Sequence, residues 1–287
     1  MSLYGAVDLH LHTTYSDGKD TPAELVGRAE ALEFTTIAVT DHDTVAGVDE
    51  AVQAAAEGGT GLRVVPGVEI SSFHVDREVH ILGLFVDTHS EPLLKTLERA
   101  RVAREERVHG IVAKLAELGV DLDAEEIFAL AESASGAVGR LHVAEVLIKQ
   151  GVTKSVAQSF QKYLGPNSPA YVPKWYPEPA DCCRLIHEAG GISVLAHPGE
   201  GMDRDFVVGL VHEGIRALEV FYPTYSSELT QRYLDLAREL DLGVSGGSDC
   251  HGRRKDSVLM GKIRLPEDVV QDLEARAGVT PTRNPNR

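Results

Sequence analysis

The sequence is poor in cysteine, in positive charge and in long apolar runs for a chain of 287 residues. It has three cysteines, two of them adjacent (Cys182, Cys183 and Cys250), which is a poor basis for a disulfide framework. The segment Met1–Gly5 and the residues after it lack the basic region and apolar stretch of a secretory signal. We therefore expect a cytoplasmic protein, and no apolar run is long enough to predict a membrane partner.

Positively charged residues are scarce as well. The chain has 28 Lys and Arg residues against 44 Asp and Glu residues, which gives a formal net charge of −16. Such an acidic chain is not expected to bind long duplex nucleic acid through the phosphate backbone of the duplex. It can still bind a small anionic substrate through metal ions, since local charge decides binding there.

The order of apolar and amphipathic segments predicts the fold class. Short runs rich in Val and Ile have the character of buried strands, and they cover residues 6–10, 36–40, 62–65, 79–86, 191–196, 217–221 and 242–246. Amphipathic helices lie between many of them, and Thr21-Pro22-Ala23-Glu24 has the residues of a capped helix start. We predict an α/β protein whose parallel sheet closes into a barrel.

The alternation breaks between about Glu91 and Pro179, where four helical patterns follow one another before a Pro-rich stretch. We predict barrel segments at 1–98 and 179–287, separated by a helical insertion at 99–178. This insertion has ten basic and ten acidic residues, so the remainder of the chain carries the whole negative charge. Its arginines either form a solvated helix face or belong to a lid that supplies positive charge to an anionic substrate.

Most of the expected strands end in a residue that can bind a metal ion. The carboxyl ends of parallel strands in a barrel converge on one rim, where active sites are built. The candidate ligands are His10, His12, Asp17, His42, Glu69, His80, His197, Asp249 and His251. His80 is the exception, because it comes early in its run and fits only if local geometry turns it inward. A mixed set of imidazoles and carboxylates suits Zn, Mn or Fe, and its size predicts two or three divalent metals.

The motifs around these residues resemble the polymerase and histidinol phosphatase family, the PHP domain. They read DLHLHTTYSDG (8–18), TDHD (40–43), PGVE (66–69), LAHP (195–198) and GSDCHG (247–252). The resemblance implies a distorted seven-stranded (βα) barrel with three metal sites. The first site would use His10, His12, Glu69 and Asp249, the second Glu69, His80 and His197, and the third Asp17, His42 and His251.

Motifs in the insertion are similar to one branch of that family, which includes AMP phosphatases, 3′,5′-nucleoside bisphosphate phosphatases and an RNA 5′-end exonuclease. The resemblance implies that Arg104, Arg107, Arg140 and Lys174 contact the substrate, although Leu141 stands where relatives often have Pro. His142 either donates a proton to the leaving oxygen or is an ordinary helix residue. Asp41 and Asp43 flank His42 and either orient ligand imidazoles or cap the next helix, which we expect for Asp43.

These observations predict a metal-dependent phosphoesterase acting on a phosphate monoester of a nucleotide, such as AMP or a 3′,5′-nucleoside bisphosphate. A metal-bridging hydroxide would attack phosphorus, with Asp41 and His142 as candidate catalytic residues. One alternative is a 5′-to-3′ exonuclease on short RNA. The others are a histidinol-phosphate phosphatase and a non-catalytic metal-binding regulatory module.

Overall fold

The computed structural model describes residues 6–134, 138–252 and 259–279. The segment Met1–Gly5, which entered the argument about a secretory signal, lies outside these residues. The chain divides into two compact units, one within Met1–Leu97 and Tyr176–Arg287 and the other within Glu98–Trp175. Among the described residues, no helix combines the length and the apolar character that crossing a membrane requires.

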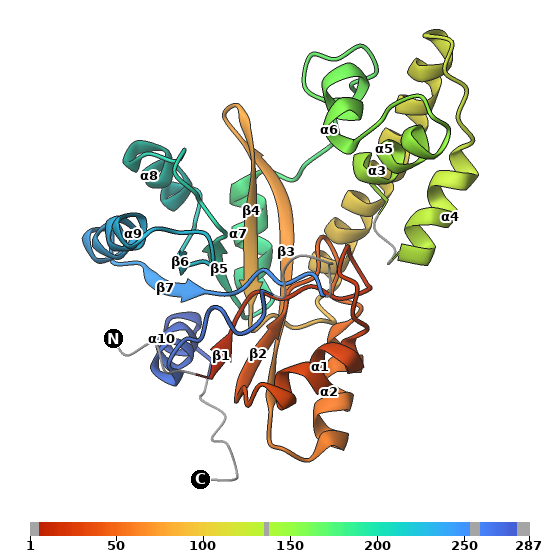
Figure 1. The fold of residues 1–287 in the computed structure, drawn as a ribbon. Coiled ribbons are helices and arrows are strands. Elements are labelled where there is room, and N and C mark those ends of the chain that lie inside the picture. The colour runs from red at the N-terminus through yellow and green to blue at the C-terminus, as the bar shows by residue number, and fades with distance from the viewer. Residues whose placement is uncertain (1–5, 135–137, 253–258, 280–287) are drawn as a thin grey trace. The chain divides into compact units, whose positions relative to one another are not determined.

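The first unit contains a seven-stranded sheet whose strands follow one another in chain order (Figure 1). The strands are β1 (Val7–Asp8), β2 (Thr36–Val39), β3 (Arg63–His74), β4 (Arg77–Leu84), β5 (Ile192–Leu195), β6 (Ala217–Phe221) and β7 (Gly243–Gly246). The segments that follow β1 and β7 join the two sides of the sheet, since Leu9 N–H donates to Gly246 O (3.2 Å) and His12 N–H donates to Cys250 O (3.1 Å). The expected barrel is therefore confirmed, as an irregular and nearly closed one.

The prediction of an all-parallel sheet is wrong at β4, which runs antiparallel to both β3 and β5. β3 and β4 form a hairpin that turns at Val75 and Asp76, where Val75 takes a φ of +57°. A tight hairpin can only join antiparallel strands. The reversal also explains His80, because the beginning of an antiparallel strand lies at the rim where its parallel neighbours end. Ser71, beyond Glu69 on β3, pairs with His80 in this register.

Helices pack against the sheet of the first unit. They are α1 (Pro22–Ala31), α2 (Val48–Gly58), α7 (Pro179–Glu188), α8 (Arg204–His212), α9 (Ser227–Glu239) and α10 (Glu267–Ala277). The helix start expected at Thr21 is confirmed: its hydroxyl accepts the N–H of Glu24, and the Glu24 carboxylate accepts the N–H of Thr21. This reciprocal pair satisfies two N–H groups that a helix leaves unpaired at its start.

Side chains along the strands alternate between two apolar clusters, as the pleat requires. Ile81 and Leu195 belong to the cluster that includes residues of α1, α2, α7, α8 and α9. Their neighbours Leu82 and Val194 belong to the second cluster, which includes residues of α10. A polar residue between two members of the first cluster therefore points to the opposite face of the sheet.

The second unit is helical. Its elements are the part of α3 (Glu91–Glu117) that lies beyond Leu97, α4 (Ala124–Ala134), α5 (Arg140–Lys149), α6 (Val156–Ser159) and a π-helical turn η1 (Phe160–Leu164). Its own core contains Val108, Ile111 and Leu115 of α3 together with Val143 and Leu147 of α5. Where the structure describes this segment, helices follow one another and no strand is present, as the sequence predicts.

We expect the three thiols to react with Ellman's reagent only after unfolding. All are free and buried, and burial raises the pKa of Cys183 to about 12 and that of Cys182 above its ordinary value. Since the thiolate is the reactive form, Cys182 and Cys183 should react at least about 10³-fold more slowly in the folded protein than in the denatured one near pH 8. A thiol that titrates rapidly in the native protein would contradict this packing.

Candidate metal centre

Two chain segments bring the first ligand-type residues together. The segment after β1 carries His10 and His12, and the segment after β7 carries Asp249. Asp249 N–H donates to His10 O at 2.9 Å, which adds to the bond between His12 N–H and Cys250 O. Gly247 makes this approach feasible, because a Cβ there would lie only 2.4 Å from His10 Cβ. Segments from the beginning and the end of the barrel thus present their side chains at one place.

Glu69 lies at the centre of the cluster. Its neighbours Val68 and Ile70 belong to the apolar layer under the helices, so its side chain points to the opposite face of the sheet, and it is fully buried. Five imidazole nitrogens lie 2.8–3.2 Å from its oxygens: those of His10, His12 and His42 from Oε2, and those of His80 and His197 from Oε1.

The side chains form three overlapping groups that could each hold a cation. Their members are His10, His12, Glu69 and Asp249; His42, Glu69 and His80; and His12, Asp17, His42 and His251. Within each group the ligand atoms lie within 4.8 Å of one another. Because neighbouring groups share His12, His42 or Glu69, the three positions adjoin.

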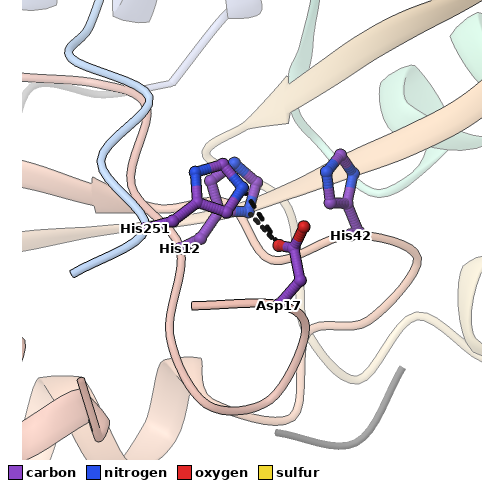
Figure 2. A group of neighbouring side chains, drawn as sticks. All are labelled: His12, Asp17, His42 and His251. Atoms are coloured by element: carbon purple, nitrogen blue, oxygen red, sulfur yellow. Dashed lines mark ion pairs between the residues drawn. The ribbon is translucent and has the colours of Figure 1, made fainter. Parts of the chain in front are cut away.

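Figure 2 shows the third of these groups, in which Asp17 faces two imidazoles. Its Oδ1 lies 3.0 Å from His251 Nε2 and 3.9 Å from His12 Nδ1. The rings of His12 and His251 are stacked, with centroids 4.1 Å apart. His42 stands on the other side of the carboxylate (Figure 2).

The grouping differs in detail from the one that the resemblance implies. His42 joins Glu69 and His80 in the second group, and His12 joins the third. His197 is in none of the three, although its Nε2 is 3.0 Å from Glu69 Oε1. All nine side chains expected as ligands nevertheless lie in this one cluster or in direct contact with it.

The charges of the cluster follow from burial and proximity. Burial alone would raise the pKa of Glu69, but the facing charged imidazoles, those of His10 and His80 among them, hold it well below its ordinary value. Burial would lower the pKa of His12, but hydrogen bonds to Asp249 and Glu69 outweigh it and raise that pKa to about 10. For His42 burial dominates and lowers the pKa to about 3, so this imidazole is neutral.

The donor atoms fit divalent metal ions. His42 Nδ1 and His80 Nδ1 are buried and make no hydrogen bond among the described residues, although each lies near a Glu69 oxygen. Buried polar atoms normally find a partner. Converging imidazole nitrogens and carboxylate oxygens are the donor set that Zn, Mn and Fe prefer.

Among the residues that contact the candidate ligands, Glu219 and Tyr222 were not expected to do so from the sequence. Glu219 on β6 lies 2.9 Å from His10 Nδ1 through Oε1. The hydroxyl of Tyr222, one residue beyond β6, donates to Asp249 Oδ2 at 2.8 Å. The sequence does contain a sign of the role of Glu219. It is an acidic residue between Leu218 and Val220 in a buried strand, and a buried acidic residue needs a polar partner.

The aspartates beside His42 support the loops of the site. Asp41 is buried, and its carboxylate accepts hydrogen bonds from Thr13 N–H (2.7 Å), Thr13 Oγ1 (2.6 Å) and Ser16 Oγ (2.5 Å). The expectation that Asp43 caps the next helix is wrong, because α2 begins at Val48 after Gly47. Asp43 instead has a φ of +54° and accepts the N–H of Ser71 at 2.9 Å, which ties its loop to β3.

We expect Asp41→Asn to lower kcat/KM by about tenfold, the loss seen when a group supporting a ligand is altered. An amide has one acceptor oxygen, so it can replace Oδ1, which accepts from Thr13 N–H and Ser16 Oγ, but its NH₂ group cannot accept from Thr13 Oγ1 as Oδ2 does. The pH–rate profile is the decisive measurement. A positioning role leaves its shape unchanged, whereas loss of one limb would show that Asp41 transfers a proton.

The predicted substrate contacts lie in the helical unit, where each can be described only within that unit. Arg107 is buried and its Nε donates to Val172 O at 2.8 Å. Arg140 donates to Leu164 O at 3.3 Å, and its guanidinium lies 5.3 Å from the centroid of the Phe160 ring. His142 Nδ1 accepts the N–H of Gly139 at 3.2 Å. Their roles, with those of Arg104 and Lys174, stay predictions.

Comparison with known proteins identifies the family. The model of the PHP domain matches residues 8–271. The chain is 36% identical to the 5'-3' exoribonuclease Rnm of Escherichia coli over 91% of this chain and 90% of that protein. It is 33% identical to a 3',5'-nucleoside bisphosphate phosphatase of Chromobacterium violaceum over 94% of this chain and 97% of that protein.

A solved structure agrees with these matches. It is of a Bifidobacterium adolescentis protein assigned as a metal-dependent phosphoesterase, and it superposes with a TM-score of 0.82 at 30% identity over 95% of this chain and 96% of that one. The family match spans nearly the whole chain and includes every strand end that carries a ligand-type residue. The chain belongs to the PHP domain family of metal-dependent phosphoesterases.

Proposed function

We propose that this enzyme hydrolyses a phosphate monoester of a small nucleotide, such as AMP or a 3′,5′-nucleoside bisphosphate, with two or three bound Mn, Zn or Fe ions. The observation that carries the proposal is the approach of five imidazole nitrogens, at 2.8–3.2 Å, to the two oxygens of one buried carboxylate, Glu69. A non-catalytic module would have no need of three adjoining donor groups.

Divalent ions in such a site lower the pKa of water and neutralise the attacking and leaving oxygens of a phosphoryl group. The residues of the chain supply the scaffold for that chemistry. The carboxylate of Glu69 fixes the positions of the imidazoles that approach it, which come from β4 and from the segments after β1, β2 and β5. Asp249 presents Oδ1 toward His10 and His12 while Tyr222 holds its Oδ2. His142 is our candidate for the proton donor to the leaving oxygen, and Arg104, Arg107, Arg140 and Lys174 are candidates for substrate contacts.

The second candidate function is 5′-to-3′ hydrolysis of short RNA, which the similarity to the Escherichia coli exoribonuclease supports. Both functions use the same metal chemistry and differ in whether the scissile phosphate carries a second nucleoside. A histidinol-phosphate phosphatase remains a third alternative.

The test is a turnover comparison on the Mn-loaded protein with p-nitrophenyl phosphate, AMP, 3′-phosphoadenosine 5′-phosphate, histidinol phosphate and a 5′-phosphorylated dinucleotide. We expect the protein to release inorganic phosphate from the nucleotides, and to do so with a higher kcat/KM than for the other substrates. Mononucleotide release from the dinucleotide at a higher kcat/KM would favour the exonuclease. No turnover on any of them by a metal-loaded protein would contradict the proposal.

A further inference from the structure

We propose that Glu219 is a positioning residue that orients His10 and His197 for metal binding, an inference that rests on the metal-dependent function proposed above. β6 is the strand from which none of the nine expected ligands comes. Glu219 stands in its middle, and its neighbours Leu218 and Val220 belong to the apolar layer under the helices. The side chain therefore points to the face on which the metal centre lies, and it is fully buried.

Both oxygens of the Glu219 carboxylate are used. Oε1 lies 2.9 Å from Nδ1 of His10, and Oε2 accepts the backbone N–H of His197 at 2.6 Å. Neither oxygen belongs to any of the three donor groups of the metal centre. Glu219 is thus not a ligand in this arrangement, and its two contacts are with residues that approach Glu69.

The contact to His10 decides which ring nitrogen carries the proton. A carboxylate only accepts hydrogen bonds, so Nδ1 of His10 must be the donor. In the neutral ring, Nε2 then keeps its lone pair, and this is the nitrogen that lies 3.2 Å from Glu69 and 3.5 Å from Asp249. A carboxylate behind a ligand imidazole fixes its tautomer and its orientation in just this way.

The contact to His197 supports an unusual backbone. His197 has a φ of +25°, a conformation that residues other than glycine seldom adopt and that the surrounding structure must hold. The hydrogen bond from its N–H to Glu219 supplies such support. The bond also sets the position from which His197 Nε2 reaches Glu69 Oε1 at 3.0 Å. One carboxylate on β6 therefore orients residues that follow β1 and β5.

The test compares Glu219→Gln with Glu274→Gln by titrating Mn²⁺ and following the electron paramagnetic resonance signal of the free ion. Glu274 is the matched control, because it is also a buried glutamate (2% exposed), but its partner is Arg63 at 2.6 Å. The amide introduced by Glu219→Gln has one acceptor for two donors, and its NH₂ group favours the wrong tautomer of His10. We expect Mn²⁺ affinity to fall about 10- to 100-fold in Glu219→Gln and to stay at the wild-type value in Glu274→Gln.

A second readout separates positioning from a merely structural role. In the Zn-loaded protein, the ¹⁵N spectrum of His10 should show a protonated Nδ1 in the wild type and a loss of that signature in Glu219→Gln. If Glu219→Gln does not fold, Glu219→Asp, which keeps the charge but is too short to reach both partners, replaces it with the same expectations. Wild-type affinity in the Glu219 variant, or an equal loss in both variants, would overturn the inference. A wild-type protein that binds none of Mn²⁺, Zn²⁺ and Fe²⁺ would instead contradict the proposed function itself.

Discussion

Glu69→Gln is expected to lower kcat/KM by at least about 10³-fold, corresponding to about 4 kcal/mol of lost transition-state stabilisation. The substitution keeps the shape of the side chain and removes its charge. Five imidazole nitrogens approach the carboxylate, and a neutral amide can satisfy only some of them. The amide would also be a poor bridge between cations, so we expect fewer bound metals per chain, measured by elemental analysis beside the steady-state assay.

The control for this prediction is Glu274→Gln, which alters a buried glutamate away from the cluster and should keep near-wild-type turnover. Melting curves of both variants in their metal-free forms show whether either loses its fold. Full activity in a folded Glu69→Gln variant would mean that the carboxylate does not hold the reactive ions, and the proposed mechanism would fail with it.

Most of the candidate ligands were accessible from the sequence because they come at or just beyond the ends of short apolar runs, which mark the strands. His10 and His12 are an example: two residues two apart share one face of an extended segment. Alternation therefore predicts that both side chains point to the same side of the segment. The sequence also contained the motifs of the family, and the distorted barrel expected from them is the fold that the first unit adopts, apart from its antiparallel strand.

The direction of β4 could not be predicted from the same signals. A run of apolar residues does not indicate which way its strand runs, and the two-residue turn at Val75 and Asp76 has none of the glycine or asparagine that marks a tight hairpin. His80 looked misplaced for this reason alone. Once the strand is reversed, an early position in the run becomes a rim position, and the residue contacts Glu69 at 2.8 Å.

Glu219 and Asp43 illustrate a second limit. Their roles are hydrogen bonds to residues distant in the sequence, to His10 and His197 in one case and to Ser71 in the other. Local patterns describe a residue's own element and say little about partners brought in by the barrel. A buried acidic residue can be recognised as needing a partner, but the partner is identified only when the strands are placed side by side.

Removal of the metals by a chelator is expected to abolish turnover, and reloading near pH 8 is expected to release about three protons per chain. In the metal-free protein, the carboxylates raise the pKa of His12 and of His80 to about 10 against the opposing effect of burial, and they raise that of His10 well above its ordinary value. These imidazoles are therefore protonated at pH 8, and each must lose its proton to become a ligand. His42, with a pKa of about 3, has no proton to lose.

Because protons compete with the metal, apparent affinity should rise at least about tenfold per pH unit between about pH 6 and pH 9. Titration calorimetry with Mn²⁺ in two buffers of different ionisation enthalpy measures the number of protons released, and reloading without any net release would show that these imidazoles are not the ligands.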